Sequence, residues 1–242
     1  MLDANHVHLW KVFLTEDELC IRQLEQSLSQ HELDRANAFH NKKDRSCFIT
    51  ARSILKKILS KYTNIPIHKI ILSYSEFGKP YLASEENVLP IQFSVTHSNN
   101  VIVLAFTLES PIGVDIEQLS PIPDFDSIAK IVFSEIEYDT WSNISFENKL
   151  QFFYQLWTYK ESVIKALGYG FSYDTKKFTI TETTKKPTII FHDSSQKANL
   201  WTIEKIFVDD MYCAAFATQQ LTPKVHYFEY CLDASAFNCV KN

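Results

Sequence analysis

Hydrophobic and polar residues alternate in several short stretches of this chain, as they do in strands with one buried face. In the first 120 residues this pattern predicts strands at 6–13, 71–75, 91–98 and 113–119, and a short apolar run predicts another at 101–108. In the last 70 residues it predicts strands at 177–183, 187–191, 200–207 and 211–218. Asn99 and Asn100 lie between two of these stretches and predict a tight turn that joins them.

Elsewhere hydrophobic residues recur every three to four positions, which is typical of helices with one buried face. Thr15 with Glu18, and Ser29 with Glu32, have the spacing of a capping box and predict two helix starts. Gly168 predicts the end of the longest helix. The remaining helices are predicted at 44–62, at 126–132, from 134 onward and at 147–167.

The two halves of the chain share a pattern, although no repeat is visible by letter. Each half contains one long predicted helix and about three strands or more. Pro111 interrupts the chain between them and predicts a domain boundary.

Composition and charge narrow the classes of function. The 29 acidic and 24 basic residues leave a net charge of −5, which argues against a broad nucleic-acid or anionic-membrane surface. The chain has 4 Gly and contains neither G-x-x-x-x-G-K nor G-x-G-x-x-G, so glycine-rich phosphate loops are excluded. No signal peptide or membrane-spanning run is visible, and the 5 Cys form no C-x-x-C pair. We expect a cytoplasmic protein with reduced thiols that binds neither nucleic acid nor membranes.

Asp115 and Glu117 form the sharpest local feature. Side chains two positions apart in a strand point to the same face, about 6.6 Å apart along the chain. Two carboxylates this close repel each other unless a cation or water lies between them. Oxygen ligands without Cys or His nearby in sequence suit Mg²⁺ rather than zinc. Taken alone, the pair fits an exposed strand face with solvated acids better, because mixed surface charge is common.

Glu161 and Lys165 lie one turn apart on the predicted helix at 147–167. Glu161 lies at the rim of the apolar stripe, where a third metal ligand could reach a neighbouring sheet. The ordinary alternative is a surface ion pair that contributes about 0.3–0.5 kcal/mol.

His97, at the end of a predicted strand beside Thr96, offers donors for a phosphate, although capping of a turn explains it better when taken alone. Lys79, which precedes Pro80, is by itself an ordinary turn lysine.

Four motifs in a fixed order change this interpretation. They are F-G-K-P at 77–80, S-V-T-H-S at 94–98, G-V-D-I-E at 113–117 and W-T-Y-K-E-S-V-I-K-A-L-G-Y-G at 157–170. Together they resemble the Sfp-type 4′-phosphopantetheinyl transferases, over a stretch from about Arg35 to Phe171.

The resemblance implies an α+β fold of two pseudo-symmetric halves, with the active site in the cleft between them. Each half would be a small antiparallel sheet packed on a long helix. Residues 1–110 would contact the nucleotide and phosphates of coenzyme A, and residues 111–242 would carry the metal ligands and the catalytic helix.

The resemblance also implies a reaction. Coenzyme A would donate its 4′-phosphopantetheine arm to a serine hydroxyl of an apo acyl or peptidyl carrier protein, releasing adenosine 3′,5′-bisphosphate. Asp115, Glu117 and Glu161 would hold Mg²⁺ at the pyrophosphate. Lys165 and His97 would bind phosphate oxygens, and Lys165 would assist the departing phosphate. Either Glu161 or a metal-bound water would accept the serine proton, and this choice stays open.

The remaining contacts with coenzyme A are expected from Lys43, at the 3′-phosphate, and from Lys79 and Thr96, which would line the nucleotide site. Two departures from the family pattern bear on them. Asn99 replaces a frequent glycine, and Glu32 falls near a position that is often basic. The second departure weakens any assignment of the residues that hold the 3′-phosphate.

Residues 125–141 occupy the stretch where the family docks its carrier protein. Ile131 and Phe133 offer apolar contact there, although core packing explains them at least as well. A monomer is expected, because one chain holds both halves. Two other functions fit less well: a non-catalytic carrier-protein-binding module of the same fold, and another Mg²⁺-dependent phosphoryl enzyme such as a nucleotide hydrolase.

Overall fold

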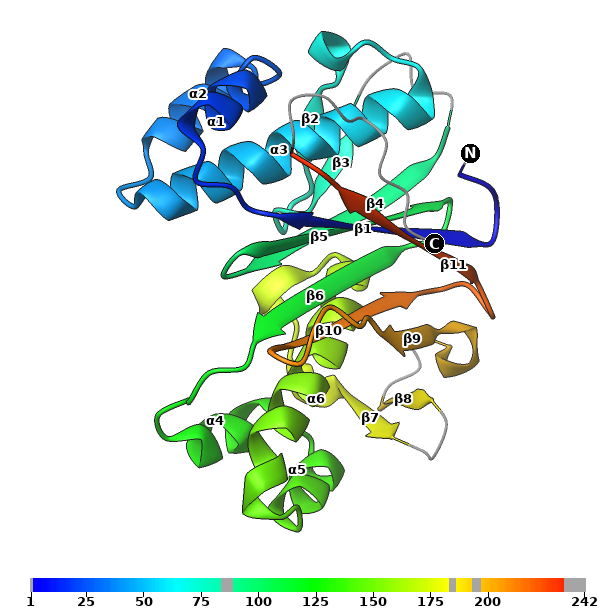
Figure 1. Cartoon of the computed structure of the whole chain (residues 1–242). Helices are drawn as coiled ribbons and strands as arrows, with labels where there is room; N and C mark the ends of the chain where they lie inside the picture. The colour runs from blue at the N-terminus through cyan, green and yellow to red at the C-terminus, as the bar shows by residue number, and fades with distance from the viewer. Residues whose placement is uncertain (1, 84–88, 183–185, 193–196, 233–242) are drawn as a thin grey trace. The chain divides into compact units, whose positions relative to one another are not determined.

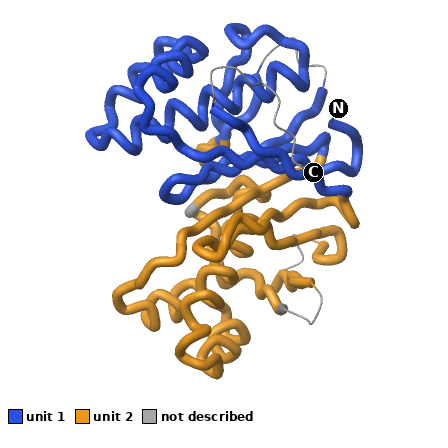
Figure 2. Tube along the Cα trace, in the orientation of Figure 1, with its two compact units in different colours: residues 1–75, 80–109, 224–242 blue, residues 76–79, 110–223 orange. Residues whose placement is uncertain are grey.

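The computed structural model describes residues 2–83, 89–182, 186–192 and 197–232, and the chain divides into two compact units (Figure 2). Unit 1 comprises residues 1–75, 80–109 and 224–242, and unit 2 comprises residues 76–79 and 110–223. The main division, between Glu109 and Ser110, lies next to the predicted boundary at Pro111. The units differ from the predicted halves in two segments, because 76–79 belong to unit 2 and the chain returns to unit 1 at Lys224.

Unit 1 is built on a four-stranded sheet in the order β11-β1-β5-β4, with the long helix α3 along one face (Figure 1). A separate two-stranded sheet pairs β2 with β3. The bounds are β1 His6–Phe13, α1 Glu18–Glu25, α2 Gln30–Asn37, α3 Lys42–Thr63, β2 Leu72–Tyr74, β3 Pro80–Leu82, β4 Ile91–Ser98, β5 Val101–Leu108 and β11 Lys224–Tyr230, with a 3₁₀ turn at Ile67–Lys69.

The main sheet of unit 1 is mixed, which corrects the expected antiparallel arrangement. β1 pairs antiparallel with β5, and β4 with β5, but β1 pairs in parallel with β11. The register of the parallel pair sets His8 opposite His226. We did not predict β11 as a strand, because a parallel pairing between the two ends of the described chain leaves no mark on local spacing.

Helix α3 covers the core of unit 1. It begins after the N-cap Asn41 and ends at Asn64, whose φ of 60° is left-handed. Ile54 and Ile58 are buried in one cluster with Val12 and Leu104 of the sheet. Of these two helix residues, Ile58 lies on the apolar stripe that we predicted for this helix.

The helix starts follow the predicted capping chemistry with one exception. The Ser29 capping box is present, since the hydroxyl of Ser29 accepts from the backbone N–H of Glu32 and the Glu32 carboxylate accepts in return. The first helix, however, has Asp17 rather than Thr15 as its N-cap. The Thr15 hydroxyl instead accepts from the backbone N–H of Asp17.

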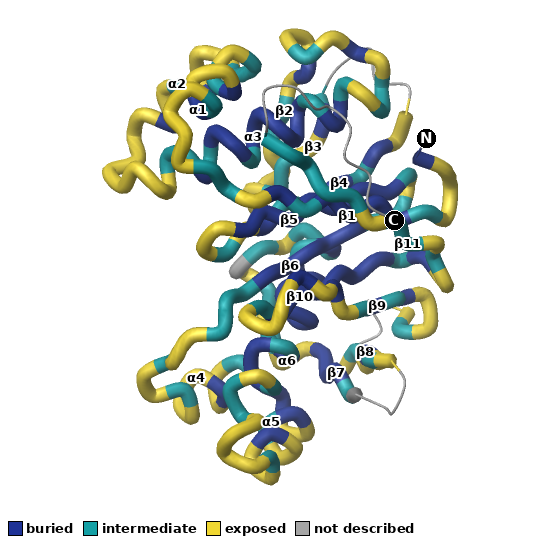
Figure 3. The backbone as a smooth tube through the Cα atoms, viewed as in Figure 1, coloured by how far each residue is buried: buried dark blue, intermediate teal, exposed yellow. Residues whose placement is uncertain are grey.

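Unit 2 packs helix α6 on a three-stranded antiparallel sheet in the order β6-β10-β9, and a separate hairpin joins β7 and β8. Strands β6 and β10 are buried along most of their length (Figure 3). No helix in the described part of the chain has the length and apolar character needed to cross a bilayer. The bounds are β6 Ile112–Gln118, α4 Phe125–Val132, α5 Glu135–Ser142, α6 Phe146–Leu167, β7 Phe178–Glu182, β8 Pro187–Phe191, β9 Thr202–Lys205 and β10 Tyr212–Thr218, with 3₁₀ turns at Gly170–Ser172, Thr175–Lys177 and Ala198–Leu200.

Candidate active site

Gly113 lets strand β6 approach helix α6 at backbone distance. A Cβ at this position would lie 1.9 Å from the carbonyl oxygen of Ser162 and 2.4 Å from the backbone nitrogen of Ala166. Because side chains alternate along a strand, Asp115 and Glu117 share the face of Gly113 and are turned toward α6. We had assigned no role to Gly113, although a glycine inside a strand signals a close approach.

Asp115 forms an ion pair across the junction of β6 and α6. Its Oδ1 lies 2.6 Å from Nζ of Lys165, and its side chain is 5% exposed against 30% for Lys165. We predicted both residues as site residues, and a surface ion pair of Lys165 with Glu161 along the helix was the ordinary alternative. The structure brings the strand acid and the helix lysine together across two elements. Two charges that were both solvated would not need this contact.

Glu161 is buried beside these charges. The pKa of its carboxyl is raised to about 7, mainly by loss of water; Lys165 lowers the pKa, and the negative charges of Asp115 and Glu117 raise it. The carboxylates of Asp115, Glu117 and Glu161 therefore lie within electrostatic range of one another in unit 2.

The chemistry of this donor set fits Mg²⁺. Three carboxylates offer the hard oxygen ligands that this ion prefers. Cys213 is a neighbour that we did not expect. The strand register sets it opposite Glu117. The Sγ of Cys213 lies 3.7 Å from the carbonyl oxygen of Gln151, to which the thiol donates a weak hydrogen bond.

Lys79 is bound to the same two elements, β6 and α6, through their backbone carbonyl groups. Its Nζ donates to the carbonyl oxygens of Ile112 at 3.0 Å and Ala166 at 3.3 Å. Burial lowers the pKa of this ammonium to about 8. These bonds explain why residues 76–79 belong to unit 2, and they give Lys79 a supporting role that its turn sequence does not reveal.

The other residues expected to bind coenzyme A belong to unit 1. Lys43 lies in the first turn of α3, donates from Nζ to the side-chain oxygen of Asn99, and lines a pocket of about 630 Å³. At the end of β4, Thr96 is buried and His97 is exposed. Asn99 has a φ of 50°, so it adopts the left-handed conformation that asparagine tolerates and that the frequent family glycine would favour.

Glu32 binds two basic residues of α3 that we had placed on faces other than its apolar stripe. Its carboxylate lies 3.1 Å from Nζ of Lys56 and 3.7 Å from Nε of Arg52, and both basic side chains are buried. The burial of these two residues was not predicted. A buried acid contributed by a different helix makes their burial tolerable.

The predicted carrier-docking segment needs one correction. Phe133 is 1% exposed and packs against Trp141 and Phe153, so its side chain is unavailable to a partner. Ile131 is 70% exposed on α4 and remains available.

Lys160, within the longest motif, is fully buried and holds unit 2 together. Its Nζ lies 2.7 and 2.8 Å from the two carboxylate oxygens of Glu137 and donates to the carbonyl oxygen of Phe178. The same carboxylate accepts from the backbone N–H of Ile180. We had assigned Lys160 no role of its own, because a lysine beside charged helix positions ordinarily faces water.

Comparisons with known proteins cover both units. A family model described as the 4′-phosphopantetheinyl transferase superfamily matches residues 111–217, and one described as the N-terminal part of a 4′-phosphopantetheinyl transferase matches residues 15–109. The 4′-phosphopantetheinyl transferase HetI of Nostoc sp. is 32% identical over 214 residues, 88% of each chain.

Two further relatives are more distant. The human L-aminoadipate-semialdehyde dehydrogenase-phosphopantetheinyl transferase is 28% identical over 80% of this chain and 68% of its own. The 4′-phosphopantetheinyl transferase gsp of Aneurinibacillus migulanus is 29% identical over 72% of this chain and 70% of its own. With both units matched and a relative this similar along most of its length, the chain belongs to the 4′-phosphopantetheinyl transferase superfamily.

Proposed function

We propose that this transferase moves the 4′-phosphopantetheine arm of coenzyme A to a serine hydroxyl of an apo acyl or peptidyl carrier protein. The reaction depends on Mg²⁺ and releases adenosine 3′,5′-bisphosphate. The observation that carries the proposal is the charge cluster at β6 and α6. Asp115 is buried against Lys165, and Glu161 responds electrostatically to both.

The three acids would hold the metal. Asp115, Glu117 and Glu161 supply the carboxylate oxygens, and the donor chemistry of this set supports the assignment. When bound, Mg²⁺ supplies positive charge that neutralises the diphosphate and stabilises the charge developing on it. Lys165 is partly exposed, so its ammonium can exchange its bond with Asp115 for one with a phosphate oxygen of the substrate. There it stabilises the charge of the leaving phosphate.

Glu161 is the proposed acceptor of the serine proton. A general base works best when its pKa is near the working pH; burial raises the pKa of this carboxyl to about 7 in the metal-free chain, and a bound cation would lower it. This property distinguishes Glu161 from an ordinary surface glutamate.

The nucleotide portion of coenzyme A is assigned to basic and polar residues of unit 1. Lys43 would bind the 3′-phosphate and His97 a phosphate oxygen, and Thr96 would line the nucleotide site. The exposed ring of His97 and the position of Lys43 at a pocket support these roles. Lys79 would reach the nucleotide in addition to supporting β6 and α6.

The exposed apolar side chains of α4 and α5 form the proposed docking surface for the carrier protein. Ile131 and Ile136 are more than half exposed, and Ile128 is partly exposed on the same helix as Ile131. Exposed isoleucines on neighbouring short helices suit a small apolar partner surface.

The test incubates the full chain with coenzyme A, Mg²⁺ and apo carrier proteins from fatty-acid, polyketide and peptide synthesis. Mass spectrometry then detects addition of the arm. We expect addition with at least one carrier, its loss on removal of Mg²⁺ by a chelator, and its loss in Asp115→Ala. Glu161→Gln should lower kcat at least 100-fold, in the range of general-base effects. Glu147→Gln, an exposed acid on the same helix, is the matched control and should keep full activity.

Three outcomes would contradict the proposal. The first is no addition to any carrier protein. The second is full transfer by Asp115→Ala. The third is release of adenosine 3′,5′-bisphosphate at the full rate without a carrier protein, which would favour a hydrolase.

A further inference from the structure

Three histidines from two strands of unit 1 form a cluster that has no part in the proposed transfer. His6 and His8 lie two positions apart on β1, and His226 lies opposite His8 on the parallel strand β11. The ring centroid of His226 lies 4.9 Å from that of His6 and 5.1 Å from that of His8. The two strands therefore present all three imidazoles on one face of the sheet.

The nitrogen atoms of this cluster are close enough to share an ion. One ring nitrogen from each histidine lies within 4.8 Å of the other two. Tetrahedral coordination at 2.0–2.1 Å would separate the nitrogens by about 3.3 Å, so each pair must close by roughly 1.5 Å at most. Small side-chain rotations of three residues on adjacent strands supply such movements, and His6 and His226 are only partly buried.

Two ring nitrogens of the cluster are buried without a hydrogen-bond partner in the described part of the chain. They are Nδ1 of His6 and Nε2 of His226. A carboxylate oxygen of Asp3 lies 3.9 Å from Nδ1 of His6, which is too long for a hydrogen bond. A buried polar atom without a partner costs free energy, and a metal ion would satisfy both lone pairs.

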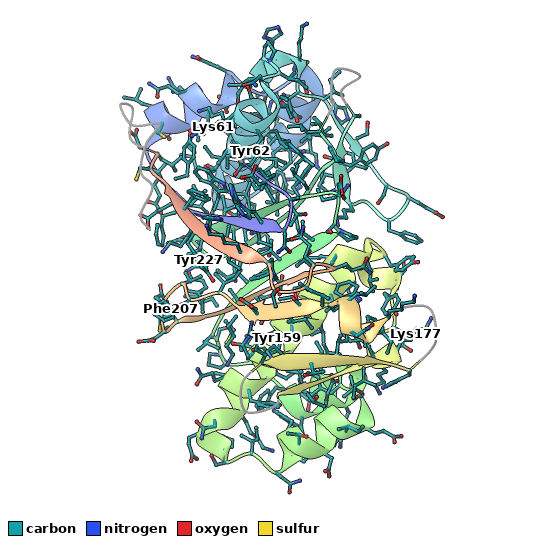
Figure 4. The ribbon with its side chains drawn as sticks, turned by 90° about the vertical axis from the view of Figure 1, so that its right-hand side faces the viewer. Lys61, Tyr62, Tyr159, Lys177, Phe207 and Tyr227 are labelled. Carbon is teal, nitrogen blue, oxygen red and sulfur yellow. The ribbon has the colours of Figure 1, made fainter. Side chains whose placement is uncertain are left out.

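His8 has the supporting contact that metal-binding histidines use. Its Nδ1 lies 2.8 Å from the hydroxyl oxygen of Tyr62, a residue that reaches from α3 towards the strands of unit 1 (Figure 4). Nε1 of Trp10 donates to the same hydroxyl oxygen at 2.8 Å and fixes its position. When Nδ1 of His8 donates to Tyr62, the lone pair of Nε2 is available to a metal. Such outer contacts orient the ring and favour one tautomer.

We propose that His6, His8 and His226 bind one divalent transition-metal ion of the zinc class. Three imidazoles suit such ions, whereas Mg²⁺ prefers oxygen. The ion would join β1 to β11 and thereby stabilise the parallel edge of the sheet. It would have no role in transfer, so this site and the carboxylate site of unit 2 are separable by experiment.

The experiment titrates Zn²⁺ into the metal-free full chain by calorimetry, with Mg²⁺ in excess to saturate the carboxylate site. We expect one equivalent to bind and the melting temperature to rise. His226→Asn should weaken binding at least 10-fold while leaving Mg²⁺-dependent transferase activity unchanged. His68→Asn, an exposed histidine of the same unit, is the matched control and should bind as the wild type does.

Two further measurements keep the test decisive. If His8→Asn fails to fold because His8 is buried, His6→Asn and His226→Asn carry the result, since both positions are partly exposed. Tyr62→Phe should weaken binding about 10-fold through the loss of its contact with His8. The absorption spectrum of the Co²⁺-loaded chain should show nitrogen coordination without thiolate charge transfer, which excludes the cysteines as ligands.

The proposal is overturned if the wild type binds no Zn²⁺ at micromolar concentrations or if His226→Asn binds as tightly as the wild type. An equal loss in His68→Asn would indicate nonspecific surface binding and would overturn it as well. A cobalt spectrum dominated by thiolate charge transfer would have the same consequence.

Discussion

Nζ of Lys165 lies 2.6 Å from Oδ1 of Asp115, although the two residues are 50 positions apart in the sequence. Asp115 is the acid of β6 that is almost fully buried. This contact links it to the rim of α6. One ion pair therefore bears on the stability of unit 2 and on the proposed chemistry.

Lys165→Met should therefore lower the free energy of unfolding by roughly 1–3 kcal/mol, because it leaves the Asp115 carboxylate without this ammonium. A double-mutant cycle with Asp115→Asn should give a coupling energy of about 0.5–3 kcal/mol. Urea unfolding of the single and double variants measures it. The Lys186–Glu204 pair has the same 2.6 Å separation but an exposed lysine, so its cycle should give less than about 1 kcal/mol. Equal coupling in the two cycles would show that burial of Asp115 has no energetic effect.

Gly113→Ala should destabilise the chain by about 2 kcal/mol or more, because the new methyl group would meet the backbone of α6. Transferase activity should fall further than stability explains, since the displaced strand carries Asp115 and Glu117. Unfolding curves and kcat for the folded variant test both effects. Gly78→Ala is the comparison. Its φ of 82° makes the substitution strained, but no atom lies within 4 Å of the added methyl group, so it should leave the position of β6 unchanged.

Lys160→Met should lower the free energy of unfolding by roughly 3–5 kcal/mol, because the Glu137 carboxylate would stay buried without its partner. Adding Glu137→Leu to this variant should recover part of the loss, since no unpaired charge then remains. Thermal unfolding of the two variants gives the comparison. Lys42→Met breaks an exposed pair with Glu18 and should change stability by less than about 0.5 kcal/mol. A mild effect of Lys160→Met would mean that Glu137 reaches water.

Lys79 should make stability depend on pH in the alkaline range. Burial lowers the pKa of its ammonium from 10.5 to about 8 in the folded chain. Between these two values the unfolded chain binds more protons than the folded chain, so the free energy of unfolding rises with pH across this window. Below about pH 8 Lys79 is protonated in both states, so the folded chain bears the full free-energy cost of burying the ammonium. The expected rise is on the order of 2 kcal/mol after allowance for partial exposure.

Urea unfolding across this window, compared between the wild type and Lys79→Met, isolates the contribution of Lys79. The variant should lack the rise. Lys176→Met is the control, because Lys176 is exposed and also donates to a backbone carbonyl, that of Lys130. A rise of the same size in Lys79→Met would assign the pH dependence to other groups.

Local spacing along the chain was sufficient to predict much of the fold. The apolar spacing of α3 and α6, the strand patterns of β1 and β4, the apolar run of β5 and the Ser29 capping box all depend on residues within a few positions of one another. Strand β11 was missed because its partner is at the other end of the described chain. For the same reason, periodicity did not reveal the burial of Arg52, since the acid that binds it lies on another helix.

The residues of the candidate site were predicted from motif order, but their mutual contacts were not. Spacing correctly indicated that Asp115 and Glu117 share a face. It did not show that this face meets α6, because that follows from the missing side chain of Gly113. The ion pair of Lys165 with Asp115 and the bonds of Lys79 to two carbonyl groups arise from the packing of separate elements.

The parallel pairing of β1 with β11 has a consequence for synthesis of the chain. During translation, the N-terminal strand emerges first, and its eventual neighbour emerges more than 200 residues later. Until then one edge of β1 offers unpaired backbone groups to any other extended peptide. The nascent chain is therefore vulnerable to misassociation until residues 224–230 have been made, and a truncated product that lacks them would retain that exposed edge.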